Sequence, residues 1–436
     1  MGACCSKDKK NTGFTDEGDE DYEEQDICAG DWGARVRLKG CCDMVSMCTQ
    51  QGRKGINQDA MTIWEEFIGE PNKIFCGVFD GHGPSGHIVA THIRDVLPSK
   101  LSLVMKSSEH HIGDRNNEGD IHNDDKGCSN HSDKDETYHP QISSWTKSFI
   151  KAFEDLDNEL SLDPTIDSYC SGSTAVTIFR QEEHLLVANL GDSRAILCTR
   201  NKKKRLVPVQ LTVDLKPNLP NEAERIKSCN GRVFAMPEEP NMCRLWLPDE
   251  NSPGLAMSRA FGDFCLKDFG LISTPKVYYT KLSSRDEFVV LATDGVWDVL
   301  SNNEVVKIVA SARKRSMAAR LLVRHAVQAW KTKYPNSKID DCAAICLFLK
   351  FPSSIAKATS GLTEKSVNQR TGSDKLATIR NNESHEAQET TTANDSKEEW
   401  SALEGVTRVN TVLQVPRFST DNSRKRSDNQ MMNVGE

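Results

Sequence analysis

A short apolar run that ends in a carboxylate constrains this chain most: residues 74–83 read Ile-Phe-Cys-Gly-Val-Phe-Asp-Gly-His-Gly. The run predicts a buried strand that ends in a tight turn. A carboxylate at a strand end, here Asp80, is held rigidly enough to bind a metal. Gly81 lets the backbone come close enough for a carbonyl oxygen to bind too, and His82 adds a titratable group. An alternative interpretation is an ordinary strand running into a polar turn, because Asp-Gly is common in turns.

The same pattern recurs later in the chain, where the predicted strand 287–292 is followed by Thr-Asp-Gly. Carboxylates that border predicted strands are Asp59, Asp80, Asp192, Asp294, Asp298 and Asp340. If these strand ends converge, the charges repel one another unless cations neutralise them. Oxygen ligands without Cys–His spacing favour Mg²⁺ or Mn²⁺ over zinc, and pairs of such ions serve hydrolysis of phosphate esters. A calcium loop is disfavoured, because no Asp-x-Asp-x-Asp-Gly spacing occurs.

Composition narrows the functional class. The 436 residues suffice for one large domain with tails or for two domains, and the net charge of −8 argues against a general nucleic-acid binder. No apolar run is long enough to cross a bilayer, and no secretory signal is visible. The 15 cysteines are scattered without a CxxC pair, which predicts that most of them are reduced, buried thiols in an intracellular protein.

The first six residues, Met-Gly-Ala-Cys-Cys-Ser, fit a myristoylation signal with Gly2 as acceptor, and Cys4 and Cys5 are candidates for palmitoylation. Two acyl chains together make a stable anchor. We therefore expect the protein at the cytoplasmic face of the plasma membrane, with a cytoplasmic or nuclear pool as a further location. The alternative is an unmodified, flexible start.

Composition also divides the chain. We predict a disordered acidic segment over 1–30, a folded domain over 45–351 and a disordered tail over 352–436. Within the domain, a helix over 85–106 is kinked at Pro98, and the His-rich stretch 107–140 is a disordered insertion. Residues 173–199 predict an antiparallel meander. The basic stretch 201–205 is interpreted as a hairpin loop, with a nuclear signal as the alternative.

Seven motifs, in this order, resemble those of the metal-dependent protein serine/threonine phosphatases of type 2C, most closely the plant members. They are Gly77–Gly83, Ser171–Ala175, Gly191–Ala195, Leu211–Pro217, Ser258–Asp263, Ala292–Asp298 and Asp340–Asp341. The resemblance covers about residues 45–350. It implies an α+β fold, a sandwich of two antiparallel β-sheets flanked by helices.

The resemblance also implies roles for single residues. Asp80 would bridge two Mn²⁺ or Mg²⁺ ions, Gly81 would add its carbonyl oxygen, and Asp294 and Asp340 would bind the second ion. Asp59 would hold bound waters, and Asp192 and Asp298 match ligands of a weaker third ion. A hydroxide between the two ions would attack phosphorus, and His82 would protonate the departing oxygen as general acid.

Three departures from the family pattern leave questions. Lys54, with Arg53 beside it, stands where many members have the arginine that binds substrate phosphate, so either residue is a candidate. Gln58 replaces a frequent Glu. The last motif reads Asp-Asp where the family usually has Asp-Asn. We take Asp340 as the ligand, and the alternative is a register shifted by one residue.

The expected partners are phosphorylated protein substrates and, through the acyl groups, a membrane; we expect a monomer. The alternative function is a pseudophosphatase that binds phosphoproteins as a membrane-tethered scaffold.

Overall fold

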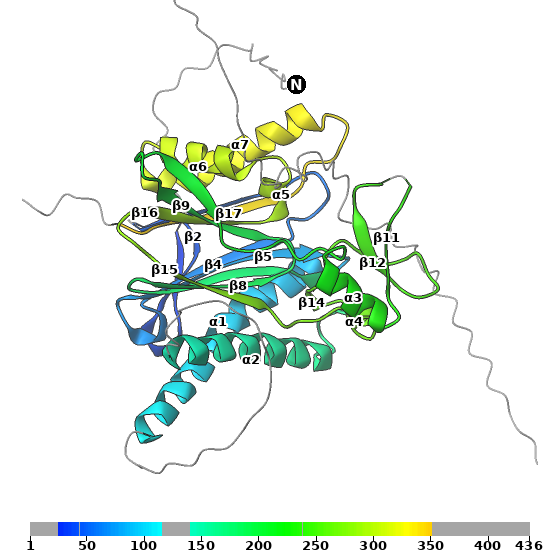
Figure 1. Ribbon diagram of the computed structural model, residues 1–436, viewed down its shortest axis with the longest axis horizontal. Helices are drawn as coiled ribbons and strands as arrows, with labels where there is room; N and C mark the ends of the chain where they lie inside the picture. The colour runs from blue at the N-terminus through cyan, green and yellow to red at the C-terminus, as the bar shows by residue number, and fades with distance from the viewer. Residues whose placement is uncertain (1–24, 43, 116–139, 238, 351–436) are drawn as a thin grey trace, which may run out of the picture. The chain divides into compact units, whose positions relative to one another are not determined.

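The structure, a computed structural model, describes residues 25–42, 44–115, 140–237 and 239–350. Two β-sheets lie face to face, and a pair of helices covers the outer face of each (Figure 1). The predicted α+β sandwich of two antiparallel sheets flanked by helices is confirmed. None of the described helices is both long and apolar enough to cross a membrane.

The first sheet has the strand order β1-β2-β4-β5-β7-β8-β15, with β6 attached to β5 and β14 attached to β6. Helices α1 (Gly86–Arg115) and α2 (Pro140–Leu162) cover its outer face. The strands are β1 (Asp26–Ala29), β2 (Arg35–Lys39), β4 (Asp59–Glu65), β5 (Lys73–His82), β6 (Gly172–Ser173), β7 (Ala175–Gln181), β8 (His184–Leu190), β14 (Phe261–Gly262) and β15 (Lys276–Lys281).

The second sheet has the order β10-β9-β16-β17-β3, and helices α6 (Asn302–Ser311) and α7 (Ala318–Lys333) cover it. Its strands are β3 (Val45–Gln50), β9 (Arg194–Arg200), β10 (Leu206–Gln210), β16 (Asp286–Ala292) and β17 (Cys342–Phe348). A third, small sheet of β11 (Arg232–Ala235), β12 (Cys243–Trp246) and β13 (Gly254–Leu255) has its own apolar cluster with α3 (Pro220–Ser228) and α4 (Phe264–Lys267).

The central strands are apolar on both faces because each face meets a different core. On β5, Phe75 and Phe79 pack toward α1 and α2, whereas Cys76 and Val78 pack between the sheets. Side chains alternate between the faces of a strand, so a one-residue slip would exchange the two sets. The register of β5 is therefore determined along its length, and this holds Asp80 in position at its end.

Two predicted boundaries are corrected by the structure. Strand β1 begins at Asp26 and pairs with β2, so the folded region starts before residue 45, and residues 26–30 do not belong to a disordered segment. Helix α1 continues through Pro98 to Arg115, so the first part of the stretch 107–140 is helical. Residues 116–139, the tail 352–436 and most of the segment 1–30 lie outside the described residues.

Candidate metal centre

The first sheet places two of the predicted carboxylates side by side. Strand β4 begins at Asp59, and Asp80 lies directly opposite it on the antiparallel strand β5. The next residue, Gly81, donates its N–H to the Gln58 carbonyl over 3.1 Å. A side chain at Gly81 would collide with the Gly86 carbonyl, so only glycine fits at this position. The backbone that follows Asp80 is therefore packed tightly against Gln58 and Gly86.

The second sheet brings two more carboxylates to the same place. Asp294 follows β16 and begins α5 (Asp294–Trp297), and Asp340 precedes the neighbouring antiparallel strand β17. Thr293 joins the two sheets here. Its Oγ1 donates to Asp59 Oδ2 over 2.9 Å, and its N–H donates to the Ala343 carbonyl over 3.1 Å. The ends of β4, β5, β16 and β17 thus converge.

The pKa of the Asp80 carboxyl group is consistent with this convergence. Burial raises the pKa of Asp80 well above its usual range, and the charges of Asp294, Asp59, Asp340 and Asp192 raise this pKa further. Burial alone raises the pKa of a carboxyl group, and neighbouring negative charges add to this effect.

Asp59 and Asp340 are subject to the same repulsion. Burial and the charges of Asp341 and Asp340 raise the pKa of Asp59 well above its usual range, although the hydrogen bond from Thr293 lowers it. Burial raises the pKa of Asp340 to about 6 even though Lys54 lowers it. Bound cations would relieve this repulsion, and the donors are all oxygens, which suits a hard divalent ion.

Two lysines neutralise part of the cluster. Lys54 Nζ lies 2.5 Å from Asp340 Oδ2, and Lys216 forms an ion pair with Asp192. Burial lowers the pKa of Lys54, but the charges of Asp340, Asp294 and Asp80 raise it above its ordinary value, so Lys54 is a cation here. Among the residues that the structure describes, no three His, Cys, Asp or Glu side chains form a ready-made ligand group around one point. Two of the carboxylates are directed toward ammonium groups instead.

The carboxylate of Asp341 has different hydrogen-bond partners from that of Asp340. Its Oδ1 accepts the N–H of Gly52 over 2.7 Å, and its Oδ2 accepts the N–H of Gln58 over 2.9 Å. Both oxygens therefore hold the backbone of the loop that precedes β4. The oxygens of Asp340 are engaged as well, Oδ1 by the N–H of Asp341 over 3.0 Å and Oδ2 by Lys54, so Asp340 faces the Lys54 cation whereas Asp341 faces the loop.

His82 ends strand β5 and contacts a residue to which the sequence pattern had assigned no role. His82 Nε2 lies 2.5 Å from Asp263 Oδ2, and both side chains are buried. A side chain at Gly172 would collide with both of them, so glycine is required where β6 passes this pair. Burial lowers the pKa of His82, but the charge and hydrogen bond of Asp263 raise it above its ordinary value. His82 Nδ1 is buried without a hydrogen-bond partner among the described residues.

Helix α2 holds the segment that carries Asp263. Asp157 Oδ1 accepts the N–H of Gly262 over 2.9 Å, and its Oδ2 lies 2.6 Å from Lys267 Nζ. The N–H of Asp263 donates to the Ser171 carbonyl over 2.9 Å. Asp263 has φ 49° and ψ 47°, the left-handed region that few residues other than Gly, Asn and Asp adopt. This combination fixes the Asp263 carboxylate against His82.

The other half of the motif Ser258–Asp263 is structural. Glu222, on α3 and only 1% exposed, accepts a hydrogen bond from Ser258 Oγ over 2.9 Å and two from Arg259. Arg225 lies 2.7 Å from the same carboxylate. Although burial raises the pKa of Glu222, the two arginines lower it to about 2. The network attaches α3 to the strand segment that leads to Asp263.

The remaining predicted residues are placed as follows. Asp192 is buried and raises the pKa of Asp80, whereas Asp298 lies one turn after Asp294 and is partly buried. Arg53 is exposed beside Lys54. The lipidation candidates Gly2, Cys4 and Cys5 lie outside the described residues.

Sequence reasoning missed the contact of Asp263 with His82, the links made by Thr293 and Asp341, and the ion pair of Lys216 with Asp192. Each contact joins residues more than 20 positions apart in the sequence, so no local spacing of residues predicts it.

Comparisons with known proteins give the family of the chain. Residues 43–333 match the family model of protein phosphatase 2C. The chain is 49% identical over 423 residues to "Probable protein phosphatase 2C 73" of Oryza sativa subsp. japonica, covering 96% of this chain and 95% of that protein. It is 47% identical over 434 residues to "Probable protein phosphatase 2C 33" of Arabidopsis thaliana, covering 88% of each.

Among solved structures, the fold resembles that of a serine-threonine phosphatase 2C from Toxoplasma gondii. The TM-score is 0.59 at 23% sequence identity, and the match covers 75% of this chain and 98% of that chain. At this identity the likeness concerns the fold alone.

Glu222 gives the first testable prediction. Its pKa is about 2 in the folded state against an ordinary 4.5, so its contribution to stability is complete above pH 4.5 and is lost as the pH falls toward 2. Glu222→Gln should lower the free energy of unfolding at neutral pH by roughly 3 kcal/mol and reduce the loss of stability between pH 4.5 and 2. Urea unfolding across this pH range measures both. The matched control is Glu224→Gln on the exposed side of α3, and equal effects of the two variants would contradict the assignment.

Proposed function

Because the chain belongs to the protein phosphatase 2C family, we propose that it hydrolyses phosphoserine and phosphothreonine in proteins with the help of two Mn²⁺ or Mg²⁺ ions. The observation that carries the proposal is the convergence of Asp59, Asp80, Asp294 and Asp340 from four strand ends of two sheets. An isolated carboxylate could be a turn residue, but several buried carboxylates at one place favour a bound cation, because a cation offsets their mutual repulsion.

The proposed ligands are those that the resemblance to the family implies. Asp80, the carbonyl oxygen of Gly81, Asp294 and Asp340 would hold the two ions. Asp59, which Thr293 orients, would bind through water, and Asp192 with Asp298 would serve a weaker third ion. When bound, such ions lower the pKa of water and neutralise the oxygens of a phosphoryl group.

Two neighbouring cations would help to bind the substrate's phosphate. Lys54 lies inside the cluster beside Asp340, and Arg53 is exposed at its edge. We assign to Arg53 the first contact with a phosphoryl group arriving from solvent, because its guanidinium can bind two oxygens at once. Lys54 would contribute a point charge deeper in the site.

His82 would donate the proton to the departing serine or threonine oxygen. Its Nε2 is taken up by Asp263, which leaves Nδ1 as the nitrogen for this transfer. Asp263 acts on the reaction through His82, so it is a positioning residue. A carboxylate that orients an imidazole in this way also stabilises its protonated form.

The acyl anchor remains a separate proposal. Myristoylation of Gly2 with palmitoylation of Cys4 or Cys5 would hold the protein at the cytoplasmic face of the plasma membrane. Gly2→Ala should move it to the soluble fraction, and an unchanged distribution would contradict the anchor. The monomeric state and the phosphorylated protein partners likewise stay predictions.

Phosphate release from phosphoserine and phosphothreonine peptides tests the function. The purified full chain should release phosphate with Mn²⁺, stop after chelation and recover when Mn²⁺ returns, because the carboxylate cluster needs the ions to bind the phosphoryl group. Folded protein that binds these peptides but releases no phosphate under any metal condition would establish the pseudophosphatase scaffold instead.

The roles of His82 and Asp263 predict a dependence on the leaving group. His82→Ala should slow hydrolysis of a phosphoserine peptide by about 100-fold or more, since an alkoxide is a poor leaving group without a proton. Asp263→Asn, which tolerates the left-handed backbone, should slow it by ~10-fold or more. Hydrolysis of p-nitrophenyl phosphate, whose leaving group is already a weak base, should change far less in both variants.

The exposed Asp268→Asn serves as the matched control for these measurements and should leave both substrates unaffected. If the Asp263 and His82 variants slow both substrates equally, the pair is structural and the acid lies elsewhere.

A further inference from the structure

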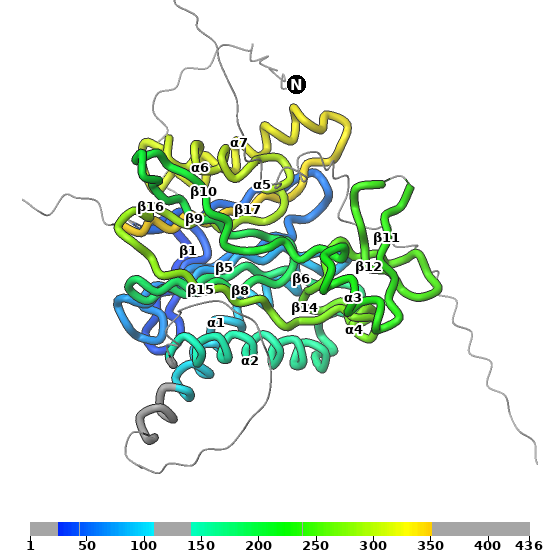
Figure 2. Tube along the Cα trace, in the orientation of Figure 1, coloured from blue at the N-terminus to red at the C-terminus, as the bar shows by residue number. Residues whose placement is uncertain are grey.

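The protein has a strongly basic surface at the end of the second sheet, although its net charge is −8. Six exposed cations define this basic surface: Lys202, Lys203, Lys204 and Arg205 at the tip of the β9–β10 hairpin, Lys307 on α6, and Arg313 just after α6. Figure 2 shows the hairpin beside α6. The tip is ordered by Asn201, whose Oδ1 accepts the N–H groups of Lys203 and Arg205.

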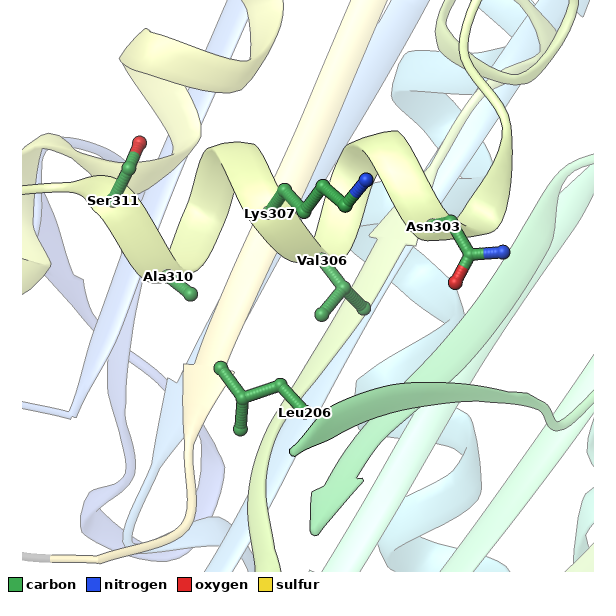
Figure 3. Close-up of a pocket in the computed structure, with 6 residues that line it drawn as sticks. All are labelled: Leu206, Asn303, Val306, Lys307, Ala310 and Ser311. Carbon is green, nitrogen blue, oxygen red and sulfur yellow. The ribbon is translucent and has the colours of Figure 1, made fainter. Parts of the chain in front are cut away.

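Contacts on both sides of the hairpin make this surface continuous. On one side, Leu206 lines a shallow hollow of about 330 Å³ with Val306, Lys307, Ala310 and Ser311, and Figure 3 shows Leu206 beneath the helix that carries the others. The hairpin tip therefore adjoins the C-terminal part of α6.

On the other side, a chain of bonds leads to further cations. Arg200 donates to the Lys204 carbonyl and lies 2.6 Å from Glu287, which also holds Lys350 at 2.9 Å. Arg315, in turn, donates to the Lys350 carbonyl. Glu287 is thus shared between two cations, and the positive charge extends from the hairpin to the end of β17.

The basic surface lies far from the candidate metal centre. Strand β9 runs from Arg194, two residues after Asp192, to Arg200 beside the hairpin tip. Seven strand residues span about 20 Å. The carboxylates and the basic surface thus occupy opposite ends of the second sheet.

The chain enters the domain near the basic end. Gln25, the first described residue, hydrogen bonds to Arg37 and lies against Gly40. Met44, four residues after Gly40, accepts the N–H of Phe348 at its carbonyl oxygen. Phe348 lies two residues before Lys350. Gln25 is therefore within about 20 Å of this end of β17. The first described residue therefore lies on the side of the basic surface.

We propose that this basic surface binds the anionic headgroups of a phosphatidylserine-containing membrane and directs the metal centre away from it. Clustered lysines and arginines near an anionic leaflet each add binding energy, and one acyl chain alone is a marginal anchor. The exposed Met317, beside Arg315, adds apolar area at this end. The proposal goes beyond the phosphatase activity and does not depend on it.

Sedimentation with lipid vesicles tests the proposal on the full chain without acylation. Vesicles of phosphatidylserine in phosphatidylcholine should bind the protein at low salt, and vesicles of phosphatidylcholine alone should not. Replacing Lys202, Lys203 and Lys204 by Gln should weaken partitioning about 100-fold. The same charge change at Lys151, Lys227 and Lys331, which are exposed on α2, α3 and α7, should have little effect. Both variants should keep the phosphatase activity of the parent protein in solution.

Two results would overturn the proposal. The parent protein does not bind the phosphatidylserine vesicles, or the two triple variants lose binding equally.

Discussion

Electrostatic repulsion between buried carboxylates is the constraint on which the rest of this structure depends. Four of them, Asp59, Asp80, Asp294 and Asp340, stand at strand ends, where burial and neighbouring negative charges raise the pKa of Asp59, Asp80 and Asp340. A protein accepts such a cost only where the surrounding fold holds the groups in place and a function uses them. Here the two sheets, joined by Thr293, provide that support, and Lys54 and Lys216 neutralise part of the charge.

The sandwich explains how residues so far apart in sequence meet. Because both faces of β5 and β17 are covered, one by a helix pair and the other by the opposite sheet, the register of each strand is set along its whole length. The position of a carboxylate that follows such a strand is therefore fixed by the strand. The same order extends to His82, which Asp263 and the Asp157–Lys267 pair hold from the side of α2.

Much of this was predictable from sequence. The apolar runs before Asp80 and Asp294 predicted the buried strands, and the resemblance predicted which strand ends meet. The long-range partners were not predictable. Asp263 follows an ordinary Phe-Gly pair, and only the fold brings it to His82; Asp341 looks like a second ligand until its oxygens are seen on the Gly52 and Gln58 amides. The start of the folded region at Asp26 was not predictable, because β1 is exposed along its length and lacks an apolar pattern.

The central claim is that these strand-end carboxylates together hold divalent ions, and counting bound Mn²⁺ tests it most directly. Calorimetric titration of the full chain should show two tight Mn²⁺ ions per molecule, and Asp80→Asn should remove both, because Asp80 would bridge them. Asp95→Asn, an exposed carboxylate on α1, should change nothing. Undiminished Mn²⁺ binding by the Asp80 variant, or none by the parent protein, would contradict the account.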